Sequence, residues 1–383
     1  MPSLADVIAA FDALYDPASA EEWDAVGLVC GDPDANVTRV LFAVDPVQAV
    51  ADEAVQWSAD LVITHHPMFL RPVHGVAATT PKGRVVHALI ANGIALHVAH
   101  TNADSAAPGV SDALAVAIGL TDVHPLAARP GEPTDKLVVF VPDPVVDKVI
   151  DVLSAAGAGQ IGNYERCAWR ASGVGTFLSG DAASPTVGST GTIEQVAEAR
   201  VEMVMPRRRR AAVLEALRDA HPYEEPAYDV YELAALPGNT GIGRVGSLAE
   251  PVSLRSFAER VAAALPSTAA GVRAAGDPAA VIQRVAVCGG AGDSLFGAVQ
   301  AAGVDAYVTA DLRHHPASEA IETSGIALVD VPHWASEWPW LQNASARLVG
   351  ALAESGTTVE TRVSTTPTDP WTLHASARGG DSH

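Results

Sequence analysis

The chain has 383 residues, of which 48% are hydrophobic and 18% charged, a composition typical of a globular protein of two or three domains. Its formal net charge of −21 argues against partners such as nucleic acid or an anionic membrane, because binding either one needs a cationic face. Three widely separated cysteines, the lack of a basic and apolar leader, and apolar runs well short of ~20 residues predict a reduced, cytoplasmic protein.

The first part of the chain alternates short β-branched runs with amphipathic stretches. A helix is predicted to begin at Ser3, because the side chains of Ser3 and Asp6 have the spacing of a capping box. Strands are then expected at 40–44, 60–64 and 94–98, and helices at 48–58, 83–91 and 111–118. This order predicts an α/β layer with a largely parallel sheet.

A stretch rich in proline and glycine at 130–134 interrupts this rhythm and is expected to be a linker. The pattern after it predicts strands at 136–141, 201–205 and 228–233, helices at 144–155 and 207–220, and a β-rich, turn-rich segment punctuated by glycines at 173–191. This order, within roughly a hundred residues, predicts a small ferredoxin-like α+β module. Residues 236–247 are expected to close that module.

The last part of the chain repeats features of the first part. The run that begins at Asp60 and leads to His65-His66-Pro67 parallels the run that begins at Asp305 and is followed by His314-His315-Pro316. The sequence Gly-Ile-Ala-Leu occurs at both 93–96 and 325–328, each time in a predicted strand that leads to a histidine. We therefore expect two related α/β halves, at 1–130 and 248–374, that face each other, with the module inserted at 131–247 and a disordered tail at 375–383.

Three predicted strands end in residues that bind metals, and ligands gather at such strand ends in α/β sheets. His333 and Glu337 have the i, i+4 spacing that places two side chains on one face of a helix. Adjacent histidines diverge in an extended chain, so His65 and His66 can reach two ions, and two ions ~3.5–4 Å apart are a common hydrolytic arrangement. The spacing leaves open the alternative of hydrogen-bonded structural histidines, although His-His pairs at two equivalent strand ends favour metal binding. The remaining candidates at these strand ends are His97, His100 and Asp104.

Four motifs resemble those of the dinuclear-metal proteins called GTP cyclohydrolase 1 type 2 homologs, the NIF-three-like family. The run at 60–67 ends in His-His-Pro, and residues 100–104 match the family's HTN-x-D segment. Residues 333–337 match its H-x-x-S-E element, and residues 22–28 resemble its WDNxGL motif, with Ala25 in place of asparagine. The sequence HPYEEPAYD at 221–229 resembles the PII-like/CutA-like domain found in longer family members, although an exposed loop with two solvated acids is the simpler interpretation.

The resemblance implies a fold of two NIF-three-like α/β halves that form one metal-binding core, with an inserted PII/CutA-like α+β domain. It implies two divalent ions per subunit, with zinc, iron and manganese all compatible with the ligands. Glu337 would touch both ions, and His97 and His100 would act in catalysis, with His315 nearby. The implied assembly is a toroidal homohexamer. The implied metal ligands are His65, His66, Asp104, His333 and Glu337.

The resemblance also implies a reaction, in which water activated by the metals attacks the guanine ring of GTP and formate is released. Two alternatives remain open at this point. The same ligands would serve a two-metal hydrolase of other nucleotide or phosphate esters, and they would equally serve a metal-binding or regulatory hexamer without catalysis.

Overall fold

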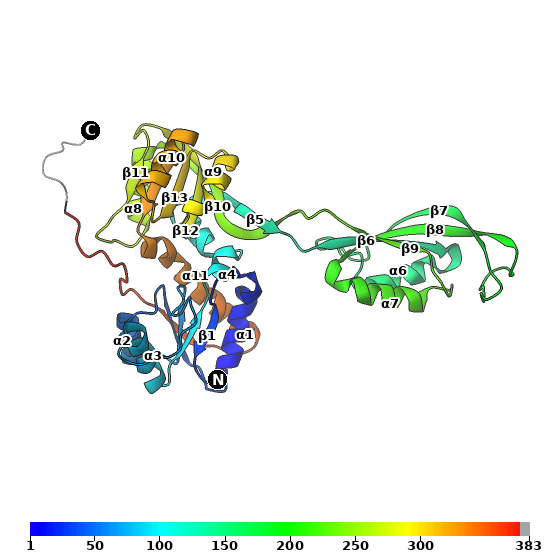
Figure 1. The fold of residues 1–383 in the computed structure, drawn as a ribbon, viewed down its shortest axis with the longest axis horizontal. Helices are drawn as coiled ribbons and strands as arrows, with labels where there is room; N and C mark the ends of the chain where they lie inside the picture. The colour runs from blue at the N-terminus through cyan, green and yellow to red at the C-terminus, as the bar shows by residue number, and fades with distance from the viewer. Residues whose placement is uncertain (376–383) are drawn as a thin grey trace. The chain divides into compact units, whose positions relative to one another are not determined.

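The computed structural model describes residues 1–375, which form two compact units (Figure 1). The first unit contains residues 1–128 and the chain from 239 onward, and the second contains residues 129–238. The second unit ends earlier than the predicted module, because strand β10 (Pro237–Ser253) pairs with the first unit's sheet from Arg244 onward. Most of the predicted tail, residues 376–383, lies outside the described residues.

The first unit contains two sheets that repeat one plan. In the first sheet, β2 (Arg39–Ala43), β3 (Leu61–Thr64) and β4 (Ala95–Val98) are parallel, and β1 (Gly27–Cys30) pairs antiparallel with β4. In the second, β12 (Val281–Ala291), β13 (Ala306–Ala310) and β14 (Ala327–Val331) are parallel, and β11 (Arg273–Ala275) pairs antiparallel with β14. The prediction of two related α/β halves is therefore confirmed.

The two halves also exchange strands. β15 (Glu360–Val363), from the end of the chain, pairs with β2 and completes the first sheet in the order β1-β4-β3-β2-β15. β5 (Leu120–Pro130), from the first half, lies at the edge of the second sheet, in the order β11-β14-β13-β12-β10-β5. This exchange was not predicted, because pairing between strands far apart in sequence leaves no local pattern.

Helices fill the space between the sheets and cover their outer faces. α1 (Leu4–Leu14), α5 (Val110–Ala117), α8 (Leu254–Ala264) and α11 (His333–Glu354) contribute to one core that includes residues of both sheets. α2 (Gln48–Trp57) and α3 (Pro81–Ala91) pack on the other face of the first sheet, and α9 (Phe296–Ala302) and α10 (His314–Ser324) pack on the other face of the second. No helix in the described part of the chain is both long and apolar enough to span a membrane.

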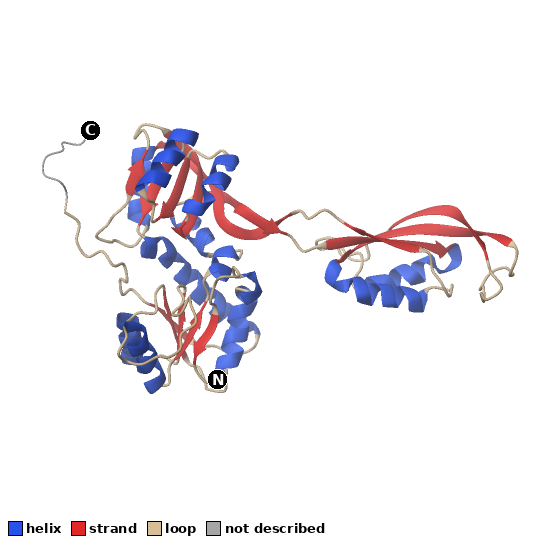
Figure 2. Cartoon of the chain, viewed as in Figure 1, coloured by secondary structure: helices blue, strands red, loops and turns tan. Residues whose placement is uncertain are grey.

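The second unit has the predicted ferredoxin-like plan. Its elements are β6 (Thr134–Pro142), α6 (Val146–Ala155), β7 (Trp169–Leu178), β8 (Ile193–Pro206), α7 (Arg210–Ala220) and β9 (Tyr228–Glu232). The strands pair antiparallel in the order β7-β8-β6-β9. Both helices lie on one face of the sheet, which leaves the other face without a helix (Figure 2). The segment expected to be β-rich and turn-rich includes part of strand β7, which contains Gly173 and Gly175.

Candidate metal centre

The candidate ligands lie where strands end and helices begin. His65 and His66 follow β3, whereas His100 precedes the short helix α4 (Thr101–Ser105), which carries Asp104. His333 and Glu337 lie in the first turns of α11, directly after β14. Both sheets therefore contribute side chains to one place within the first unit.

Glu337 is the centre of this cluster, and its side chain is almost fully buried. Its Oε2 lies 3.1 Å from Nε2 of His66, and its Oε1 lies 3.0 Å from Nε2 of His333. Oε1 also lies 3.5 Å from Nε2 of His65, which is 3.7 Å from Oδ1 of Asp104. The structure thus brings together all five predicted ligands.

Each histidine of the cluster forms a hydrogen bond through its Nδ1 atom, which fixes the orientation of the ring. The Nδ1 atom of His65 lies 3.0 Å from the carbonyl oxygen of Ala99. The other three rings each face a carboxylate, at Nδ1–Oδ distances of 2.7 Å for His66 and Asp45, 2.8 Å for His100 and Asp24, and 2.6 Å for His333 and Asp311. Carboxylates and carbonyls only accept hydrogen bonds, so Nδ1 carries a proton, and in the neutral ring Nε2 presents a lone pair to the centre.

The donor set fits divalent cations. Nε2 of His66 lies 3.2 Å from Nε2 of His333, and two lone pairs at that distance repel unless a cation or proton lies between them. Oδ1 of Asp104 and Oε2 of Glu337 are buried without a hydrogen bond. Ligand atoms of His65, His66 and His100 lie within 4.8 Å of one another, as do those of His66, His333 and Glu337. Two overlapping groups of this kind are able to hold two ions.

The charges of the cluster are strongly coupled. Burial alone would lower the pKa of His333, but the carboxylate of Glu337 raises that pKa to about 9. Burial likewise opposes protonation of His66, yet Glu337 and Asp45 hold its pKa well above the ordinary value. Burial raises the pKa of Asp104. Without metal, the imidazoles therefore retain protons that cations would have to displace.

Glycine is required where β12 passes the centre. Gly290 has a φ of +67°, and a Cβ atom at this position would lie 2.5 Å from Oε1 of Glu337 and 3.1 Å from Nε2 of His333. Its backbone N–H donates to the hydroxyl of Ser336 over 2.9 Å. The backbone thus approaches the ligands more closely than any side chain would allow.

Two histidines expected near the centre lie elsewhere. His97 is buried against α1, with its ring 5.8 Å from that of Phe11 and its Nε2 3.2 Å from Oδ1 of Asp12. The pair His314-His315 opens α10 and does not end a strand, because β13 stops at Ala310. His315 is exposed, and its described ring contact is with His314. The expected equivalence of the two His-His pairs is therefore wrong.

The three aspartates that face Nδ1 of the histidine rings were not predicted as part of the centre. Asp24 lies in the motif at 22–28, and it also accepts hydrogen bonds from the backbone and hydroxyl of Thr101. Asp311 directly follows β13, and Asp45 lies two residues after the end of β2. When Asp60 is aligned with Asp305, Asp311 falls at the position of His66, so the internal repeat carried a usable signal.

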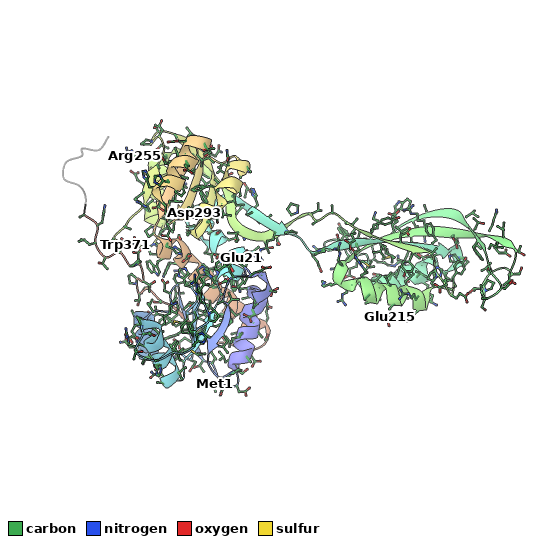
Figure 3. All side chains as sticks on the ribbon, in the orientation of Figure 1. Met1, Glu21, Glu215, Arg255, Asp293 and Trp371 are labelled. Atoms are coloured by element: carbon green, nitrogen blue, oxygen red, sulfur yellow. The ribbon has the colours of Figure 1, made fainter. Side chains whose placement is uncertain are left out.

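A cavity of about 730 Å³ opens beside the centre. His66 and His333 line its inner wall, and Arg273 and Trp334 line its sides. The C-terminal segment at 368–374 forms another wall, and Trp371 on this segment is marked in Figure 3. The hydroxyl of Thr368 donates to Asp45, which ties this segment to the centre.

Comparison with known proteins relates the whole chain to one family. Residues 2–370 match the family model Duf34/NIF3 (NGG1p interacting factor 3). The chain is 55% identical over 371 residues to a "GTP cyclohydrolase 1 type 2 homolog" of Mycobacterium tuberculosis, covering 97% of both chains. It is 36% identical over 367 residues to the protein of that name in Bacillus subtilis, covering 96% of this chain and 97% of that one.

Solved structures agree with this relationship. A Bacillus cereus protein related to NIF3 has a TM-score of 0.76 and 35% identity, with 97% of this chain and 99% of that chain covered. Staphylococcus aureus protein SA1388 has a TM-score of 0.81 and 27% identity over the same shares of the two chains. From the matched residues and the shared fold, the chain belongs to the Duf34/NIF3 family.

Proposed function

We propose that this chain is a metal-dependent hydrolase that holds two divalent cations and opens the guanine ring of GTP. The observation that carries the proposal is the pair of facing Nε2 atoms of His66 and His333, with the buried carboxylate of Glu337 against both. The name of the relatives at 55% and 36% identity, "GTP cyclohydrolase 1 type 2 homolog", supports the choice of substrate.

The five proposed ligands gather around the carboxylate of Glu337. Its Oε1 faces His65 and His333, its Oε2 faces His66, and Asp104 lies beside His65. Zinc, iron and manganese all accept imidazole and carboxylate ligands, so each is a candidate. A pair of such ions would lower the pKa of bound water towards ~7 and supply hydroxide near neutral pH.

His100 is placed to move a proton. Its Nδ1 faces Asp24, whose pKa is well below the ordinary value: burial opposes this shift, but hydrogen bonds from His100 and Thr101 outweigh it. The Nε2 atom of His100 is then available to take a proton from water and return it to a ring nitrogen of the substrate. The reaction would add one water to the imidazole carbon of guanine and break one of its C–N bonds, which leaves a formamide. A second water would then cleave the remaining C–N bond, release formate and leave an amine on the pyrimidine.

The cavity beside the centre is suited to a nucleotide. Trp371 offers an exposed aromatic face on which a base can stack. Arg273 is a cation on the same wall, and it currently pairs with Asp330. The volume of about 730 Å³ lies within the range of ~300–1,000 Å³ typical of small-molecule sites.

The test is formate release from GTP by protein loaded separately with zinc, manganese or ferrous iron. We expect formate from the wild-type protein, none from Glu337→Gln, and wild-type rates from Glu319→Gln, whose side chain is exposed on α10. Phosphate release without formate would instead identify a hydrolase of phosphate esters. Stoichiometric metal with no turnover on any nucleotide would identify a metal-binding or regulatory protein and overturn the proposal.

We also propose that the chain assembles as a toroidal homohexamer. The family resemblance supports this assembly. So do the exposed apolar side chains of Leu70, Val73 and Val76, which lie close together in sequence between β3 and α3. Exposed apolar groups of this kind favour association between subunits.

A further inference from the structure

The second unit contains a cavity of about 640 Å³, a size suited to a small molecule. It lies on the face of the sheet that carries no helix. The segment at 179–192 and the motif at 221–229 line its rim. The cavity is independent of the proposed metal chemistry, because all its residues belong to the second unit.

Glycines in β7 create the space. Gly173 and Gly175 line the cavity, and a Cβ atom at Gly175 would overlap the carboxylate of Glu198. The absence of that side chain allows the carboxylate of Glu198 to lie over the strand. Phe140 and Phe177 provide apolar and aromatic walls on either side.

Two polar groups converge inside the cavity. The side chain of Glu198 is only 8% exposed, and no cation forms an ion pair with it among the described residues. The hydroxyl of Tyr223 is buried, and the carboxylate of Glu198 is its polar neighbour. Burial and the hydrogen bond with Glu198 raise the pKa of Tyr223 to about 12, so its hydroxyl stays neutral. A buried carboxylate that no cation neutralises is costly unless a ligand satisfies it.

The rim is held in place by hydrogen bonds between its two segments. The backbone N–H of Tyr223 donates to Nδ1 of His221 over 3.1 Å, so Nε2 of His221 donates to the carbonyl of Phe140 over 3.0 Å. The hydroxyl of Thr186 donates to the carbonyl of Pro222, and the N–H of Ser184 donates to Glu224. These contacts tie the segment at 179–192 to the motif at 221–229 at the rim of the cavity.

The charges around the cavity favour cationic ligands over anionic ones. Three carboxylates line it, those of Glu198, Glu224 and Glu225. The single cationic side chain in the lining, Arg200, already pairs with Glu202 at 3.0 Å. A phosphate or carboxylate ligand would meet repulsion here, whereas a cation would gain a charge-assisted hydrogen bond in a poorly solvated place.

We propose that this cavity binds a small organic cation, an amine or amidine attached to an apolar ring. The cationic N–H groups donate to the carboxylate of Glu198 and to the hydroxyl oxygen of Tyr223. The ring lies against Phe140 and Phe177. The HPYEEPAYD motif thus has a specific role as the rim and one polar wall of a ligand site.

The experiment uses the full chain and two fluorescent probes of matched shape, 1-naphthylmethylamine and 1-naphthoate, with binding followed by fluorescence anisotropy. We expect saturable binding of the amine and at least tenfold weaker binding of the carboxylate. Glu198→Gln and Tyr223→Phe should each weaken amine binding, Glu198→Gln by about tenfold or more. The control Glu215→Gln, on the exposed face of α7 in Figure 3, should bind the amine like the wild type.

Gly175→Ala provides a second, steric test, because its methyl group displaces the carboxylate of Glu198. It should weaken amine binding while far-ultraviolet circular dichroism stays unchanged. Equal affinity for the two probes, wild-type affinity in Glu198→Gln, or no saturable binding of the amine would each overturn the proposal.

Discussion

The imidazole rings of the candidate metal centre are held in place by other groups of the protein. Three aspartates and one backbone carbonyl fix the Nδ1 protons, so every Nε2 atom points to a common place. Such supporting groups typically change metal affinity by ~10- to 100-fold when removed. The geometry of this centre therefore depends as much on Asp24, Asp45 and Asp311 as on the ligands themselves.

Gly290→Ala should remove bound metal from the protein. Its Cβ atom would lie 2.5 Å from Oε1 of Glu337 and force that ligand out of position, and the positive φ adds strain of ~1–3 kcal/mol. We expect metal content, measured by elemental analysis, to fall from the two ions per chain proposed for the wild type to less than half an ion. Gly297→Ala is the matched control, because a Cβ atom there meets nothing within 4 Å in helix α9. Full metal content in Gly290→Ala would contradict this account of the centre.

At the scale of single residues, the sequence predicted the candidate metal ligands better than the aspartates that hold the histidine rings in place. His333 and Glu337 are four positions apart on a helix, a spacing that is visible without a structure. Asp45 bonds to Nδ1 of His66 although the two residues are 21 positions apart, and no local sequence pattern indicates such a contact. His97 shows the opposite error: it follows the right strand pattern, but the alternation of β4 turns its side chain towards α1.

At the scale of elements, local chemistry predicted helix starts well. The Ser3–Asp6 capping box begins α1 as expected, with Oγ of Ser3 accepting from the N–H of Asp6 over 3.1 Å. The glycines at 173 and 175 lie within β7, in the segment expected to be β-rich, where they leave space over the sheet. The short strand β15 was missed, since its pairing partner β2 lies more than three hundred positions away.

The second unit should depend on the carboxylate of Asp135 in β6. It is fully buried and accepts hydrogen bonds from Nε of Arg210 at 2.7 Å and Nε of Arg207 at 3.1 Å. Arg210 is the main cause of its lowered pKa. A lowered pKa in the folded state gives stability that is present above the unfolded pKa of ~3.9 and is lost as pH falls through the lower folded pKa.

Asp135→Asn should therefore lower the melting temperature of the second unit by about 5 °C at pH 7. The difference from the wild type should shrink as the pH is lowered through 4 towards 2, and circular dichroism melts across this range provide the measurement. Asp147→Asn is the control, because its pairs with Arg166 and Arg170 are exposed and contribute little. An equal effect of both substitutions would contradict the role given to burial.

At the scale of the whole molecule, the repeat was the most informative signal in the sequence. Two similar runs predicted two halves, and the matching strand orders in the two sheets confirm them. The exchange of β5 and β15 could not be predicted, because either half would be a plausible sheet without it. The repeat therefore predicts that the chain contains two related halves, but it does not predict the exchange of strands between them.

The proposed homohexamer gives a prediction about mass. Light scattering on the full chain should give six times the subunit mass of 39.4 kDa. Val73→Glu should reduce the assembly size, because a charge cannot be buried in an apolar contact without a partner. Val116→Glu, at another exposed apolar position, should leave the size unchanged. A wild-type mass equal to one subunit would contradict the assembly.

The candidate metal centre takes residues from both halves of the chain, so it is complete only in a full-length subunit. A chain that terminates within the second unit carries His65, His66, His100 and Asp104 but lacks His333, Glu337 and the strand that completes its first sheet. Truncated products of translation or proteolysis would therefore keep the group His65, His66 and His100 but lose the group that contains His333 and Glu337. If the chain holds two ions as proposed, the metal content per chain would then distinguish intact subunits from fragments.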